Sequence, residues 1–123
     1  MSEKNTEITI DEKELSVAET EAKDAKSVYV HEFETPFTYE GKTYDKLTFD
    51  WGSLTGKDSL AIETELQDLG KAVIVPEFSG DYLIRMAARA CTEKISPDHL
   101  LGMRLADYNK IRGKARSFLL NLT

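Results

Sequence analysis

Aromatic side chains are concentrated near the start of this chain in a pattern that suits an extended backbone. Of the eleven aromatic residues, seven lie between positions 29 and 51. Apolar and aromatic side chains recur there at even spacing, first in residues 29–39 and again in residues 47–51. Side chains with this spacing share one face of a β-strand, whereas on a helix they would point in different directions. The pattern therefore predicts two half-buried strands.

A turn signal separates the two strands. Gly41, in the middle of Glu40-Gly41-Lys42, supplies the positive φ that a tight connection tends to require, so we predict a β-hairpin. Pro36 has no backbone N–H to donate to a ladder, and it predicts an edge strand or a β-bulge in the first arm. An exposed strand edge would be a ready surface for strand addition.

The apolar period changes to a helical one after the hairpin. Thr55, followed three residues later by Asp58, resembles a capping box, and Gly70 suits the position just after a helix end. We predict a helix over residues 56–69, whereas residues 73–76 fit either a short extended segment or a last apolar turn. The apolar positions at helical spacing are Ile62, Leu66, Leu69 and Val73.

A second helix is predicted to begin after Ser79, which is a good N-cap residue. Its outer face carries charged residues four apart, which predicts ion pairs between Asp81 and Arg85 and between Arg89 and Glu93. Its apolar stripe is predicted to be buried and consists of Leu83, Met86, Ala87, Ala90 and Cys91.

Two further helices complete the predicted fold. Ser96 and Pro97 begin a short one, because proline at the first helical position loses no hydrogen bond. The last helix begins between Arg104 and Asp107. The chain is therefore expected to have an α+β, mainly helical fold, with an N-terminal β-hairpin followed by three or four helices. The apolar face of the last helix is predicted to be Tyr108, Ile111, Ala115, Phe118, Leu119 and Leu122.

Residues 1–27 differ in composition from the rest of the chain. They contain no aromatic residue, no glycine and no proline, with eight acidic and four basic side chains. So few apolar groups cannot offset the entropy of ordering the backbone, so a disordered acidic tail is predicted. Residues 28–123 are predicted to form one domain.

The distribution of charge and the single cysteine limit which partners and which cell compartment can be expected. The net charge of −6 is uneven, because residues 1–78 hold 8 basic and 18 acidic side chains and residues 79–123 hold 8 and 4. An acidic chain is repelled by nucleic acid, which makes such a partner disfavoured. Cys91 cannot pair within the chain, and neither a signal peptide nor a membrane-spanning run is recognisable, so a cytoplasmic protein without membrane contact is expected.

The sequence lacks the residue clusters that most enzymes and metal sites need. His31 and His99 stand alone in different elements, and Cys91 lies on a predicted buried stripe. A packed or hydrogen-bonded histidine is expected at position 31 and a solvent-facing one at position 99. We therefore expect no catalytic residues, no metal and no cofactor.

Basic side chains on the last helix are the remaining charged feature. A solvated outer face is the simplest interpretation. The alternatives are contact with the chain's own acidic tail, with an acidic protein or, least favoured, with nucleic acid. The residues are Arg104, Lys110, Arg112, Lys114 and Arg116.

The order of the short motifs resembles the phage tail assembly chaperone family. Residues 33–41 match the pattern L-x-x-P-x-x-x-x-G with Phe33 in the place of leucine, and Thr55 with Asp58 matches t-x-x-D. In the helical half, the pattern L-x-x-x-D-x-x-x-I-x-x-x-x-x-x-F-L is matched by Met103 or Leu105 near Asp107, then by Ile111, Phe118 and Leu119. The resemblance covers about residues 33–122, and the acidic extension departs from it.

The resemblance implies a binding protein that acts during the assembly of a phage tail. Such chaperones coat the tape measure protein, recruit tail tube subunits to it in the host cytoplasm, and are absent from the mature virion. Further expected partners are a frameshifted longer product of the same gene and other copies of the chain in a homo-oligomer. The alternatives are a structural or adaptor component retained in a tail particle and a small nucleic-acid-binding regulator.

Candidate contact residues follow from the predicted hairpin and the basic last helix. Tyrosines that do not face the core can bury a large area while keeping the hydroxyl hydrated. The candidates are Tyr29, Tyr39 and Tyr44 on the hairpin, and Arg104, Lys110 and Lys114 on the last helix.

Overall fold

The computed structural model describes residues 27–122, and its N-terminal element is the predicted hairpin. Strand β1 (Val28–Tyr39) pairs antiparallel with β2 (Lys42–Asp50). The connection is a tight turn in which Glu40 and Gly41 both have positive φ, at 48° and 80°. A two-residue turn of this hand matches the twist of the flanking strands, so it closes the hairpin without splaying them. The predicted tail falls on residues 1–26, outside the described residues.

The bulge predicted at Pro36 is present. The register of the ladder shifts between Glu32 and Phe37 of β1. Phe33 lies within the shifted segment and Phe37 directly after it, and their rings remain in contact at a centroid distance of 5.6 Å. The bulge therefore absorbs a residue that cannot donate a hydrogen bond while the aromatic face continues along the hairpin.

The first helix has the caps that the sequence predicts. A short 3₁₀ turn, η1 (Trp51–Ser53), leads into α2 (Gly56–Asp68), and the Thr55 N–H donates to Asp58 Oδ2 at 2.8 Å. At the other end, Gly70 adopts a φ of 74°, and the N–H of Lys71 donates to the carbonyl of Leu66. These bonds satisfy backbone groups that the helix itself leaves unpaired.

The remaining helices also follow the predicted order. They are η2 (Pro76–Phe78), α3 (Gly80–Ala90), α4 (Pro97–Leu101) and α5 (Leu105–Leu120). Ser79 Oγ accepts a hydrogen bond from the Tyr82 N–H at 3.1 Å, as expected of an N-cap. Residues 71–75 form neither a strand nor a helical turn; they are a loop that ends in η2. Two side chains of the predicted apolar faces, Leu69 and Leu122, lie at or beyond helix ends and are exposed.

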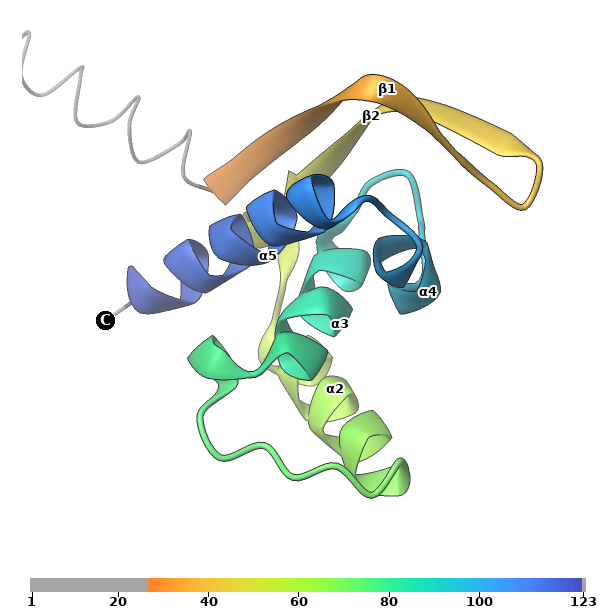
Figure 1. The fold of residues 1–123 in the computed structure, drawn as a ribbon. Helices are drawn as coiled ribbons and strands as arrows, with labels where there is room; N and C mark the ends of the chain where they lie inside the picture. The colour runs from red at the N-terminus through yellow and green to blue at the C-terminus, as the bar shows by residue number, and fades with distance from the viewer. Residues whose placement is uncertain (1–26, 123) are drawn as a thin grey trace, which may run out of the picture.

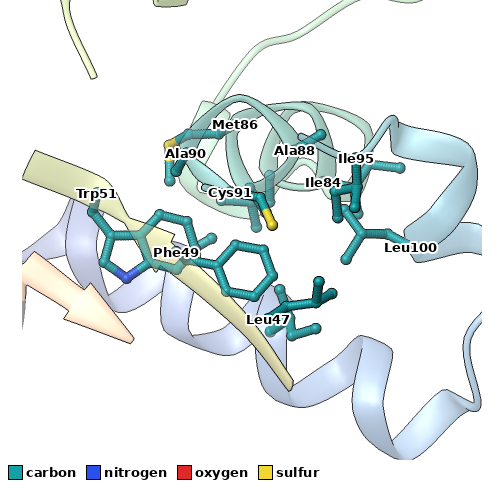
Figure 2. Packing of buried hydrophobic residues seen from close by; sticks show 14 of the residues in the cluster. Leu47, Phe49, Trp51, Ile84, Met86, Ala88, Ala90, Cys91, Ile95 and Leu100 are labelled. Carbon is teal, nitrogen blue, oxygen red and sulfur yellow. The ribbon is translucent and has the colours of Figure 1, made fainter. Parts of the chain in front are cut away.

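The core lies between the inner face of the hairpin and helix α3. The hairpin arches over α4 and α5, α3 runs through the centre, and α2 lies at the far end from the hairpin (Figure 1). Buried residues of the described elements join in one cluster. Figure 2 shows side chains from β2 and η1 facing those of α3 and of Cys91, which follows it; the labelled ones include Leu47, Phe49, Trp51 and Met86. The even-spaced aromatic face and the helical stripe of α3 therefore bury each other.

One of the two predicted ion pairs on α3 is wrong. Arg85 pairs with Asp81 at 3.5 Å, but Arg89 pairs with Asp58 of α2 at 2.8 Å and not with Glu93. The reason is that α3 ends at Ala90, so Glu93 lies beyond the helix and outside the i,i+4 geometry. The bond from Arg89 is the main cause that lowers the pKa of Asp58.

No helix in the described part of the chain combines the length and apolar character needed to cross a membrane.

Candidate protein-binding surfaces

The three candidate tyrosines of the hairpin lie on its inner side. Tyr44 is buried, with 8% of its surface exposed, and Tyr29 and Tyr39 are half-buried. Tyr39 packs against α4, where a Cβ built on Gly102 would lie 3.7 Å from its ring. The expectation that these tyrosines do not face the core is therefore wrong for Tyr44, and the other two are largely used for packing. A hairpin over a helical layer can bury only one face, and its tyrosines belong to that face.

His99 differs from its expected position as well. It is half-buried rather than solvent-facing, and its ring lies 4.1 Å from that of Tyr39 between centroids. Its Nδ1 accepts a hydrogen bond from the backbone N–H of Ser96 at 3.1 Å, so it completes the N-terminal cap of α4. His99 thus fixes the hairpin tip to α4.

His31 is the centre of a hydrogen-bonded chain that links the hairpin to α5. It is 3% exposed, and its Nε2 lies 2.7 Å from Asp107 Oδ1 while its Nδ1 lies 2.8 Å from the Tyr29 hydroxyl. A carboxylate can only accept, so the Nε2–H of His31 donates to Asp107, and Nδ1 of the same ring pairs with the Tyr29 hydroxyl. This confirms the expected hydrogen-bonded histidine.

The environment keeps the Tyr29 hydroxyl protonated. Burial, followed by the negative charge of Asp107, raises the pKa of Tyr29 above its usual range. The three residues form a hydrogen-bonded connection between β1 and α5.

Two of the three candidate basic residues of α5 meet at one cavity. Arg104 and Lys110 are exposed and line a cavity of about 340 Å³ together with Glu32 and Glu34 of β1, beside the His31 and Asp107 pair. Lys114 lies elsewhere, with its Nζ 5.3 Å from the centre of the Tyr29 ring. The cavity is lined by charges of both signs, so it offers no uniformly positive surface for phosphates.

The other basic residues of α5 are used inside the fold. Arg116 donates from Nε to the carbonyl of Glu77 at 2.9 Å and lies over the Phe78 ring. Arg112 lies over the Tyr108 ring at 5.6 Å. The basic sequence of α5 is therefore divided between packing contacts and the mixed-charge cavity.

Cys91 is a buried packing residue, as the sequence predicts. Its Sγ lies 3.4 Å from Glu93 Oε1, and burial raises the pKa of the thiol to about 12. Among residues 27–122, no group of three or more His, Cys, Asp or Glu side chains is arranged to hold a metal ion.

The thiol of Cys91 is expected to be unreactive in the folded protein. With a pKa of about 12, its thiolate fraction at pH 8 is about a thousandfold lower than that of an ordinary thiol. A disulfide reagent such as DTNB should therefore label the native chain at least about a thousandfold more slowly than the chain in denaturant. Rapid labelling without denaturant would contradict the burial of this side chain.

The exposed apolar side chains are the surface feature that the sequence analysis did not identify. On α2, Leu60 is 65% exposed, although it lies only two positions from buried Ile62. Leu69 at the helix end is 54% exposed, and Ile74 in the following loop is 90% exposed. A position two residues from a buried one points to the other side of a helix, and this offset was the available signal.

The outward face of α2 forms a shallow groove between these leucines. The groove has a volume of about 650 Å³, and its described lining residues are Lys57, Leu60, Ala61, Thr64, Glu65, Asp68 and Leu69. Most of these positions recur three or four residues apart and so share one side of the helix. The stripe exposes Leu60 near one end and Leu69 at the other, and Ala61, Thr64, Glu65 and Asp68 lie between them, so apolar and charged side chains alternate along it. We call these residues the α2 stripe.

Comparison with protein-family models, with curated proteins and with solved structures finds no match to this chain.

Proposed function

We propose that the protein is a non-catalytic tail assembly chaperone, which binds the tape measure protein of a phage and recruits tail tube subunits to it. The observation that carries the proposal is the α2 stripe, where Leu60 and Leu69 remain exposed beside charged residues. Exposed apolar side chains next to charged ones are typical of a surface that binds another protein.

A helical segment is the partner that fits this stripe. An amphipathic helix places apolar side chains at positions i, i+3, i+4 and i+7, and it can lay this face along a groove of matching length. Helix α2 offers apolar Leu60 and Ala61 on its outward face, and Leu69 follows its last residue, Asp68. Polar and charged side chains lie beside these apolar groups and could pair with those of the partner. The resemblance in the order of motifs names the tape measure protein, which is long and helical, as that partner.

The proposal includes the place where the protein acts. A carrier of an aggregation-prone helix works before the tube encloses its client, so the chain would act in the cytoplasm of the infected bacterium and be absent from the finished virion. The net charge of −6 favours solubility of the complex. A longer product of the same gene would share the described domain.

The proposal is tested by producing the chain together with the tape measure protein encoded beside it and measuring how much of the latter stays soluble. Leu60→Asp with Leu69→Asp should reduce capture at least about tenfold, because a buried interface residue commonly contributes the equivalent of that factor. Leu105→Asp is the matched control: Leu105 is also exposed but lies at the start of α5, where an acidic residue suits the helix dipole.

Three outcomes decide between the candidate functions. Loss of capture by the α2 variant and not by the control supports the chaperone. If the unmodified chain, supplied with its longer product, leaves the tape measure protein insoluble, the chaperone proposal is wrong. Detection of the chain in purified mature particles would instead favour a retained tail component.

A further inference from the structure

The two edges of the hairpin differ in how they are covered. On β2, the segment after α3 closes the outer edge: the Thr92 N–H donates to the carbonyl of Thr48 at 2.8 Å, and the Thr48 N–H donates to Glu93 Oε1 at 2.8 Å. Within residues 27–122, β1 pairs only with β2, so its outer edge has no strand beside it. A sheet edge without a neighbour is a template for further pairing.

The bonds made along the outer edge of β2 show which backbone N–H and carbonyl groups of β1 point outward. Both polar backbone groups of Thr48 point away from β1, and Thr48 lies directly opposite Val30. In an antiparallel ladder, two residues that face each other in this way form a non-hydrogen-bonded pair. The N–H and the carbonyl of Val30 therefore point outward, and by alternation so do those of Val28 and Glu32.

The side chains along this edge include exposed apolar groups. Val28 is 40% exposed and Val30 is 44% exposed, on the face of the hairpin away from the helices. Glu32 on the same face lies opposite Lys46 of β2, which balances its charge.

We propose that a second copy of the chain adds its β1 strand antiparallel to this edge, with Val30 opposite Val30 across a two-fold axis, so that two hairpins form one four-stranded sheet. This interface lies on the hairpin and leaves the α2 stripe at the far end of the molecule free (Figure 1). It therefore goes beyond the proposed function and does not rest on it.

The sequence of β1 is complementary to itself in this register. With Val30 at the axis, each Glu32 faces Val28 of the other copy, and each row of the joined sheet carries no pair of like charges in adjacent strands. In each copy Thr48 lies opposite Val30. The central row of the joined sheet therefore reads Thr48, Val30, Val30, Thr48, and all four side chains are β-branched. A register centred on Glu32 would place two carboxylates opposite each other and is disfavoured. A two-fold axis requires this kind of self-complementarity.

The pairing is limited in length, so the dimer is expected to be weak. The bulge that starts after Glu32 ends the regular edge, and the five residues before it bury less area than the roughly 800 Å² per partner of a standard interface. Monomer should dominate at about 1 µM and dimer should appear as the concentration rises to about 200 µM.

The test is sedimentation of the full chain with substitutions at the axis. Val30→Lys and Val30→Glu each place two like charges opposite each other, and each should raise the dimer dissociation constant at least about tenfold. An equal mixture of the two variants places opposite charges at the axis and should restore association. Val30→Thr, which keeps a β-branched side chain, is the control and should still dimerise.

The substitutions are placed where the fold tolerates them, because the side chain of Val30 points to solvent. Thermal melts in dilute solution verify that each variant is folded. A chain that stays monomeric up to about 200 µM overturns the proposal. So does a dimer that survives both charged variants, or a Val30 amide that is protected from hydrogen exchange in the monomer.

Discussion

Replacement of Trp51 by alanine is expected to lower the free energy of unfolding by about 3–5 kcal/mol, the usual range for loss of a buried large aromatic side chain. Trp51 is fully buried in η1, directly after β2. Its ring stacks on Phe49 at 5.4 Å and on Phe118 of α5 at 6.2 Å. It therefore joins the hairpin, α5 and the core, and its removal leaves a cavity bordered by all three.

Urea unfolding followed by circular dichroism measures this effect, since the variant lacks the only tryptophan. Because domains of this size are stable by about 5–15 kcal/mol, the variant should lose a large part of its stability. Leu60→Ala is the control, since Leu60 is exposed on α2 and should change stability by no more than about 0.5 kcal/mol. Equal losses for the two variants would contradict the position of Trp51 in the core.

Replacement of Asp107 by alanine is expected to cost about 2–3 kcal/mol. The carboxylate accepts the hydrogen bond from His31 Nε2 at 2.7 Å, and its loss leaves a buried donor without a partner. Asp107 also lies in the first turn of α5, where a negative charge stabilises the helix by about 0.3–1 kcal/mol. The two effects add because they act on different groups.

Asp98→Ala separates the two contributions. Asp98 is exposed in the first turn of α4, so it resembles Asp107 in its position at a helix start. The hydrogen bond to the buried His31 belongs to Asp107. Its replacement should cost no more than about 1 kcal/mol in the same urea experiment. A double-mutant cycle of Asp107→Ala with Tyr29→Phe then measures the coupling through His31, and additive effects would show that the chain of hydrogen bonds carries no extra stability.

The polar cavity and the exposed apolar side chains lie in different parts of the molecule. The cavity at Arg104 and Lys110 is lined by charges of both signs, and the histidine beside it is fully used by Tyr29 and Asp107. The exposed apolar residues lie instead on an outward helix face and along a strand edge. Both surfaces suit contact with extended partners rather than enclosure of a small molecule.

The hairpin and the helix ends could be predicted from the sequence because their causes are local. The turn at Gly41, the bulge at Pro36 and the capping box of Thr55 and Asp58 each depend on residues within a few positions of one another. Backbone sterics and first-turn hydrogen bonds decide these features wherever the segment lies. The same is true of the Ser79 cap.

The sequence also determined which face of α3 is buried, because its apolar period is strong enough to specify one side. The ion-pair partners of the charged residues on its outer face were not all specified by the sequence. The pairing of Arg89 with Asp58 joins residues 31 positions apart, and no local rule distinguishes it from the i,i+4 partner.

Only the tertiary structure decided how the hairpin is used. The alternation of aromatic residues shows that one face is buried, but it does not say that Tyr44 belongs to the core or that Tyr39 rests on α4. His31 and Asp107 are 76 positions apart, and their contact exists because α5 passes beneath β1. Likewise, Leu60 and Val30 are exposed because no other described element covers them. Local patterns specify elements, whereas burial, pairing and exposed surface depend on which elements meet in space.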